Sequence, residues 1–222
     1  MILKESILYG VGVGPGDPDL LTLKALKVLK AVDVIVCPAK GGKPGIAYEI
    51  ACQAYPDLEQ KEILPLDFPM IKEKQTRAHR EAADRITALL QAGKSVVFLT
   101  LGDPCLYSTF TYVAAIVKER GFPVRIISGV SSFCAAAAKA QIPLAEGEEP
   151  VMITAGEYRD FDGPLIIMKA GKNLKKLKEE IKACGKKAFL AENCGMAEER
   201  IYSDLEAMPD EAGYFSILLV KP

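Results

Sequence analysis

The first half of the chain alternates short apolar segments with segments in which apolar residues recur at helical spacing. The short segments predict strands, and the recurring pattern predicts amphipathic helices. Repeated alternation of this kind indicates a mostly parallel sheet with helices on both faces. The expected strands are residues 7–13, 32–38, 62–66, 95–100 and 124–127, and the expected helices are residues 18–31, 46–55, 72–92 and 109–120.

From about residue 128 onward, strands outnumber helices, which indicates a mixed sheet. The pattern therefore predicts two α/β domains, residues 1–127 and 128–222, with an interdomain cleft of the kind that often binds ligands. In the second domain, helices are expected at residues 131–140 and 173–184, and strands at residues 151–154, 165–169, 187–192, 199–204 and 214–220.

Composition narrows the class of protein without identifying it. The 222 residues are 50% hydrophobic and 26% charged, as is usual for a globular protein, and the net charge of −1 gives no reason to expect nucleic acid or an anionic membrane as partner. No apolar run approaches the roughly 18 residues of a membrane span, and residues 1–6 lack the features of a signal peptide. We therefore expect a cytoplasmic protein with no membrane association.

The six cysteines and the single histidine do not form a metal-binding pattern. No C-x-x-C pair occurs, and no cysteine lies near His79, so we expect no metal. The expected state of the cysteines is reduced, with the thiols buried as small apolar side chains. His79 lies in the charged helix expected at residues 72–92, and a surface position is predicted for it.

A glycine-rich turn, residues 10–17 (G-V-G-V-G-P-G-D), follows the first expected strand. Its spacing does not fit the dinucleotide motif G-x-G-x-x-G, because Pro15 or Asp17 stands where the last glycine is needed. A carboxylate at a helix entrance also repels pyrophosphate, so a nicotinamide dehydrogenase is disfavoured. Asp17 and Pro18 have the residue types of a helix cap and first helical residue, and the turn can be structural or can hold a ligand.

Two further segments place polar groups where an open α/β sheet binds ligands. Residues 100–108 (T-L-G-D-P-C-L-Y-S) follow a strongly apolar strand, and Asp103 can accept hydrogen bonds from a ligand or cap the next helix. Residues 129–138 begin with a glycine, and Ser131 and Ser132 open a helix of small residues. These two serines can contact a ligand or cap that helix.

In this order the three segments resemble the tetrapyrrole (corrin/porphyrin) methylase family. Residues 12–22 (G-V-G-P-G-D-P-D-L-L-T) match its first loop, and residues 102–108 match G-D-P-x-x-Y-S; residues 165–171 and 192–195 are similar to its later segments. Residues 8–18, 100–109 and 142–148 are most similar to the precorrin-2 C20-methyltransferases, including their cobalt-factor II counterparts. A departure is Cys194, where relatives often carry another small residue.

The resemblance implies two α/β domains, a homodimer, and S-adenosylmethionine as methyl donor for a tetrapyrrole in cobalamin biosynthesis. Asp103 and Asp17 are the candidates for a base that assists removal of the substrate proton, and the sequence does not identify the base. The implied substrate contacts are Gly14, Gly16, Asp17 and Tyr107, and the implied cofactor contacts are Pro15, Leu101, Gly102, Asp103, Leu106, Ser131, Ser132, Met168, Cys194, Ser216 and Ile217.

The implied substrate carries carboxylates that require cations. The candidate cations, each of which can equally be a solvated surface charge, are Arg77, Arg80, Arg159, Lys169 and Lys172. Other functions stay open: a methylase of the same superfamily that acts on a protein histidine derivative, as diphthine synthase does, or on ribosomal RNA; a corrin methyltransferase for another position; and a non-catalytic corrinoid-binding protein. The sequence also leaves open whether the substrate contains cobalt.

Overall fold

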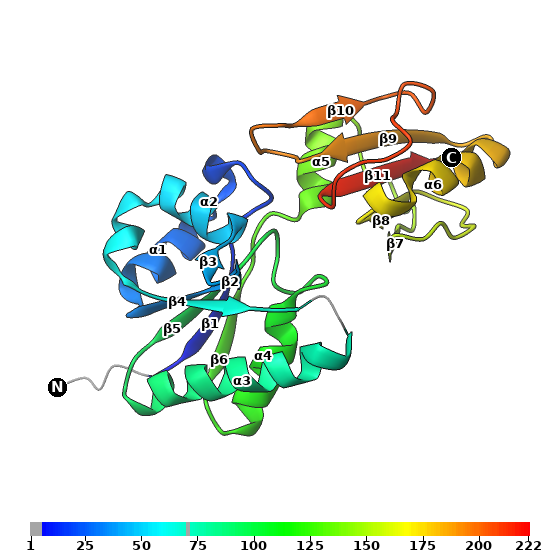
Figure 1. Cartoon of the computed structure of the whole chain (residues 1–222). Coiled ribbons are helices and arrows are strands. Elements are labelled where there is room, and N and C mark those ends of the chain that lie inside the picture. The colour runs from blue at the N-terminus through cyan, green and yellow to red at the C-terminus, as the bar shows by residue number, and fades with distance from the viewer. Residues whose placement is uncertain (1–5, 70–71) are drawn as a thin grey trace. The chain divides into compact units, whose positions relative to one another are not determined.

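The computed structural model describes residues 6–69 and 72–222, and the chain divides into two compact units. The first unit ends at Val130 and the second begins at Ser131, and each has its own sheet and its own helices (Figure 1). The α/β fold with two sheets that the sequence predicts is therefore confirmed.

The sheet of the first unit is built on five parallel strands in the order β4–β2–β5–β1–β6 (Figure 1). A short sixth strand, β3 (Lys43–Pro44), runs antiparallel to the end of β2, and the sequence pattern did not predict it. The five parallel strands are β1 (Leu8–Gly12), β2 (Val34–Lys40), β4 (Glu62–Asp67), β5 (Val96–Thr100) and β6 (Val124–Ile127).

Alternation of side chains along the strands divides the first unit into two cores, one on each face of the sheet. Ile35 and Cys37 of β2 belong to the core beneath α1 (Leu23–Ala31) and α2 (Ile46–Ala54). Val34 and Val36 point to the opposite face, into the core beneath α3 (Lys72–Gln91) and α4 (Thr109–Glu119). Strands buried on both faces read as continuous apolar runs, which is why the sequence located them.

The prediction of one continuous helix over residues 18–31 is wrong, because the structure has two separate helical segments there. A short 3-10 helix, η1 (Pro18–Leu20), comes first, and the Asp17 side chain accepts a hydrogen bond from the N–H of Asp19, 2.9 Å away. Thr22 then caps α1 by accepting from the N–H of Ala25 at 3.1 Å. Two capping residues in succession start two helical segments, so the predicted capping role of Asp17 is confirmed for the shorter one.

The second unit contains the predicted mixed sheet, in the order β10–β9–β11–β8–β7. β7 and β8 are parallel and the other neighbours are antiparallel. The elements of this unit are α5 (Ser132–Ala140), β7 (Met152–Ala155), β8 (Leu165–Met168), η3 (Gly171–Asn173), α6 (Leu174–Ala183), β9 (Lys187–Glu192), β10 (Arg200–Tyr202) and β11 (Ser216–Lys221). The first unit also contains a second 3-10 helix, η2 (Pro56–Gln60).

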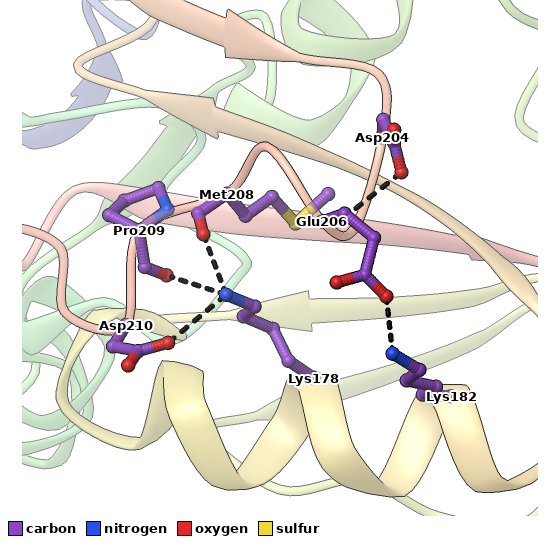
Figure 2. Close-up of polar contacts among 7 residues, drawn as sticks. All are labelled: Lys178, Lys182, Asp204, Glu206, Met208, Pro209 and Asp210. Atoms are coloured by element: carbon purple, nitrogen blue, oxygen red, sulfur yellow. Dashed lines mark hydrogen bonds and ion pairs between the residues drawn. The ribbon is translucent and has the colours of Figure 1, made fainter.

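The segment between β10 and β11 is fastened to α6 by two lysines (Figure 2). The ammonium of Lys178 donates to the carbonyl of Met208 at 2.6 Å and lies 3.1 Å from Oδ1 of Asp210. One turn later, Lys182 pairs with Glu206. The two lysines therefore tie the segment that precedes β11 to α6.

The cysteines and the histidine depart from what the sequence indicated. Cys37 and Cys194 are buried and Cys52 is half-buried, but the expected burial is wrong for the exposed residues Cys105, Cys134 and Cys184. None of the six forms a disulfide in the part of the chain that the structure describes. His79 is half-buried rather than on the open surface, since its ring stacks on Tyr112 at 5.0 Å between centroids.

The described residues contain neither a metal-binding cluster nor a membrane-spanning helix. No group of three or more histidine, cysteine, aspartate or glutamate side chains in residues 6–69 and 72–222 could hold a metal ion. No helix in the same ranges is long and apolar enough to cross a membrane.

Candidate functional site

Three glycines meet at the carboxyl ends of neighbouring strands in the first unit. Gly12 ends β1, Gly102 follows β5, and Gly129 follows β6. A Cβ atom at Gly129 would lie 2.2 Å from the carbonyl oxygen of Gly102 and 2.8 Å from the Cα of Gly12, and one at Gly12 would lie 2.4 Å from the same oxygen. Such distances exclude any side chain, so the close contact of the three loops requires glycine.

Backbone hydrogen bonds join the first two loops. The N–H of Gly102 donates to the carbonyl of Gly14 at 2.8 Å, and the N–H of Val13 donates to the carbonyl of Thr100 at 2.9 Å. Gly14 and Gly102 both have positive φ, 83° and 72°, which residues other than glycine rarely adopt. The two glycine motifs thus form one backbone platform.

Asp103 connects this platform to the third loop. Its Oδ1 accepts from the N–H of Cys105 at 2.7 Å, and its Oδ2 accepts from the N–H of Gly129 at 3.0 Å. The alternative in which Asp103 caps α4 is wrong, because Ser108 is the cap and accepts from the N–H of Phe110 at 3.0 Å. Asp103 is half-buried, and although the Cys105 thiol also bonds to this carboxylate, the carboxylate keeps acceptor capacity for a ligand donor.

The remaining expected residues of the first unit lie on the same two loops. Pro15 and Gly16 are buried beside Gly14, and Asp17 is half-buried at the start of η1. Leu101 and Leu106 are half-buried, whereas Tyr107 is 50% exposed and has φ of 48°. The structure therefore brings together the expected contacts from residues 14–17 and 101–107.

In the second unit, the expected contacts lie at one end of the sheet. Met168 ends β8 and pairs with Ile217 of β11, and Ser216 pairs with Glu192, which ends β9 just before Cys194. Antiparallel pairing places the ends of β8 and β9 beside the start of β11. Met168, Cys194, Ser216 and Ile217 therefore form one group.

The serines of the second unit differ in the groups that they offer. Ser216 is fully buried, and its hydroxyl donates to the carbonyl of Gly213 at 2.6 Å, so this hydroxyl fixes the start of β11. Ser131 occupies the N-cap position of α5 but makes no side-chain capping bond, so of the two alternatives for this serine the capping one is wrong. The half-buried Ser131 and Ser132 thus present hydroxyls at the start of α5.

A network that the sequence did not reveal holds the loop after β9. Glu199 accepts from the N–H of Gly195 at 2.6 Å and pairs with Lys139 of α5 at 3.0 Å. Burial alone would raise the pKa of Glu199, but the bonds from Gly195, Lys139 and Cys194 together lower that pKa below its usual value. The sequence carries only one signal for this loop, Asn193, a residue type that tolerates the φ of 48° observed there.

The candidate cations differ in what surrounds them. Lys169 directly follows β8 with φ of 57°, and its ammonium lies 5.8 Å from the ring centre of Tyr214, within the group of expected contacts. Arg77 pairs with Glu81, and Arg159 pairs with Glu157, both on the exposed surface. Arg80 and Lys172 are exposed as well. The structure therefore places Lys169 at the candidate site, while Arg77 and Arg159 are engaged in surface ion pairs.

Comparison with protein families gives one result that spans most of the chain. The family model described as Tetrapyrrole (Corrin/Porphyrin) Methylases matches residues 7–209. This match includes the glycine platform, Asp103, the serines of α5 and the ends of β8 and β9.

Three similar proteins have the same methyltransferase activity, at carbon 20, in their names. A protein of Methanocaldococcus jannaschii named probable cobalt-precorrin-2 C(20)-methyltransferase is 48% identical over 75% of this chain and 73% of its own length. The precorrin-2 C(20)-methyltransferase of a Sinorhizobium species is 32% identical over 96% of this chain and 94% of its own length. The cobalt-precorrin-2 C(20)-methyltransferase of Salmonella typhimurium is 31% identical, covering 96% and 95%.

Solved structures show the same fold at lower sequence identity. A cobalt precorrin-4 methyltransferase superposes with a TM-score of 0.74 at 22% identity over 97% of this chain and 95% of that one. A uroporphyrin-III C-methyltransferase from Thermus thermophilus, solved with S-adenosyl homocysteine, gives 0.72 at 22% identity and covers 96% of each chain. With its two sheets, its glycine platform and a family match from residue 7 to residue 209, this chain belongs to the tetrapyrrole (corrin/porphyrin) methylase family.

Proposed function

We propose that the protein transfers a methyl group from S-adenosylmethionine to carbon 20 of precorrin-2 or cobalt-factor II, in cobalamin biosynthesis. The observation that carries this proposal is the 48% identity with the Methanocaldococcus jannaschii protein, whose name specifies that position. Two further relatives with the same position in their names cover 96% of the chain, so the likeness extends to both units.

The residues present are suited to S-adenosylmethionine. The glycine platform leaves backbone exposed to a ligand, and Asp103 keeps acceptor capacity for a hydroxyl or ammonium group. In the second unit, Met168 offers a polarisable sulfur and Ser131 a hydroxyl that caps nothing. We assign the cofactor contacts to the residues expected from the sequence, and we place the tetrapyrrole against the first unit.

S-adenosylmethionine, when bound, supplies a methyl group already activated by its sulfonium. The protein then has to hold donor and acceptor in line, and positioning of this kind can supply several kcal/mol of the barrier reduction. Rigid backbone loops serve that purpose well: the Gly102–Gly14 bonds and the Asp103–Gly129 bond restrain all three loops.

The substrate loses a proton when its carbon is methylated, and the two candidate carboxylates differ in the hydrogen bonds that they already accept. Both oxygens of Asp103 already accept backbone hydrogen bonds, so part of their acceptor capacity is taken up within the protein. Asp17 uses only Oδ1, for Asp19, and among the described residues its Oδ2 has no donor. We therefore assign proton removal to Asp17 and ligand binding to Asp103.

Two further expectations from the family resemblance are part of this proposal: a homodimer and a cytoplasmic location. Light scattering on the purified protein tests the first, and a mass of one chain at micromolar concentration would contradict it. Fractionation of the cells that produce the protein tests the second, since recovery with membranes would contradict it.

The activity is tested by incubating the protein with isotopically labelled S-adenosylmethionine and, separately, precorrin-2 and cobalt-factor II. Label is expected in the tetrapyrrole at carbon 20 with at least one of them. A third incubation with uroporphyrinogen III addresses another relative, the uroporphyrinogen-III C-methyltransferase of Bacillus subtilis, which is 36% identical over 70% of this chain and 58% of its own length. Label in that compound alone, or in no tetrapyrrole, would refute the assignment.

A further inference from the structure

The short hairpin of β2 and β3 stands beyond the carboxyl end of β5. Val34 and Val36 of β2 pair with β4 on one side and with β5 on the other. Ala39 pairs with Asp67 of β4 and with Pro44 of β3, so β3 must lie on the side of β2 where β5 lies. β3 thus pairs with β2 on the same side as β5, beyond the residues of β2 that pair with β5.

Strand register sets the height of the hairpin above the glycine platform. Val36 is level with Phe98, and the same register brings Pro38 level with Thr100, the last residue of β5. Lys40 and its partner Lys43 come two residues later, about 7 Å beyond the end of β5. They therefore lie above the strand that leads into the Gly102–Asp103 loop.

Both lysines belong to the same face of the hairpin. Residues directly opposite each other in an antiparallel pair project to one side, and Lys40 is opposite Lys43. Along β2, Lys40 also shares the side of Val34 and Val36, which face α3 and α4. The loop that contains Asp103 leads into α4, so the lysines and this loop lie toward the same face of the sheet.

Two like charges directly opposite each other destabilise a hairpin. Both lysines are exposed, and neither ammonium has a carboxylate partner among the described residues. The nearest acid in the register, Asp67, accepts instead from the N–H of Gly42 at 3.1 Å and so holds the turn in place. Folding therefore gains nothing from this pair of charges, and both ammonium groups are accessible to a ligand.

We infer that Lys40 and Lys43 form a cationic clamp that binds carboxylate groups of the tetrapyrrole at the carboxyl edge of the first sheet. The inference rests on the proposed function, because it takes the substrate to be a polycarboxylate. Two ammonium groups on a restrained turn suit a pair of neighbouring acid side chains, and each contact is a charge-assisted hydrogen bond. Sequence patterns did not single out either lysine, since β3 became visible only in the structure.

The test is a fluorescence titration of the full-length protein with uroporphyrin, a porphyrin with eight carboxylates, in the presence of S-adenosylhomocysteine. The variants are Lys40→Gln, Lys43→Gln and the double variant, and coproporphyrin, with four carboxylates, is the second probe. Each single change is expected to weaken uroporphyrin binding about threefold and the double change about tenfold, as for exposed charge pairs. The loss should be smaller for coproporphyrin and should shrink as salt is added.

Lys118→Gln is the matched control, because Lys118 is exposed near the end of α4, which leads back to the amino edge of the sheet. Its uroporphyrin affinity should equal that of the unaltered protein. Thermal stability of the double variant should be unchanged or higher, since the repulsion is removed, and its S-adenosylhomocysteine affinity should not change. A structural role for the lysines predicts the opposite, lower stability.

The possible failures are distinguishable. If the unaltered protein binds uroporphyrin and the double variant binds it equally well, or no worse than Lys118→Gln, the clamp is refuted while the proposed function stands. If the unaltered protein binds neither porphyrin and methylates no tetrapyrrole, both the clamp and the proposed function are refuted.

Discussion

Replacement of Gly129 by alanine tests the glycine platform directly. The added Cβ would lie 2.2 Å from the carbonyl oxygen of Gly102, so the third loop must move by roughly 1 Å to reach ordinary contact. Overpacking of this kind costs about 1–3 kcal/mol. The movement also strains the bond from the Gly129 N–H to Asp103, a charge-assisted bond of about 1.5–3 kcal/mol. Partial relaxation leaves an expected loss of about 2–4 kcal/mol.

Urea denaturation measures this loss, which corresponds to a midpoint lower by about 1 M. Gly213→Ala is the matched control, because a Cβ at Gly213 meets no atom within 4 Å, and its midpoint should stay close to that of the unaltered protein. Affinity for S-adenosylhomocysteine should fall with Gly129→Ala and stay constant with Gly213→Ala. Equal midpoints for the two variants would refute the claim that the three loops require glycine at their contact.

Three other changes have expected outcomes. Asp103→Asn places an amide against two backbone N–H donors, so calorimetry should show S-adenosylhomocysteine affinity at least about tenfold lower and stability lower by about 1–3 kcal/mol; unchanged affinity would remove Asp103 from the cofactor site. Glu199→Gln should lower the free energy of unfolding by about 0.5–1 kcal/mol at neutral pH. The reason is that the lowered pKa of Glu199 stabilises the folded state at pH values above 4.5, the usual pKa of a glutamate. This difference should vanish as pH falls through the lowered pKa, and a difference that persists in acid would show that charge is not its cause. Burial lowers the pKa of His79 below 6.5, so the folded state favours the neutral ring and loses stability as pH falls below that value. His79→Phe keeps the ring but does not titrate, and it should lose less stability than the unaltered protein between roughly pH 8 and pH 5; parallel losses would contradict the burial argument.

The sequence was sufficient for the strands because continuous apolar runs such as that of β5 have few other interpretations. The sequence was insufficient where a single polar residue determines where a helix begins. Thr22 breaks the first helix with a cap that the apolar spacing conceals. β3 is two residues long and consists of a lysine and a proline, so no apolar pattern exists to reveal it.

The candidate site was predictable in its residue types but not in its bonds. The glycines predicted that backbone segments approach closely. The Asp103–Gly129 bond was not predictable, because it joins residues far apart in the chain that only the order of the parallel strands β5, β1 and β6 brings together. The pairing of Lys139 with Glu199 arises in the same way, from a helix and a loop of the second unit. Cysteine burial failed as a prediction because composition does not locate a single side chain, as the exposed Cys105 shows.

The central claim, methyl transfer to carbon 20, is tested most directly by locating the new methyl group. S-adenosylmethionine with a ¹³C-labelled methyl is incubated with the protein and with precorrin-2 or cobalt-factor II, and the product is examined by nuclear magnetic resonance. We predict one labelled methyl, bonded to carbon 20 of at least one of the two substrates. A labelled methyl on a different carbon, or an unlabelled tetrapyrrole with both, would contradict the account.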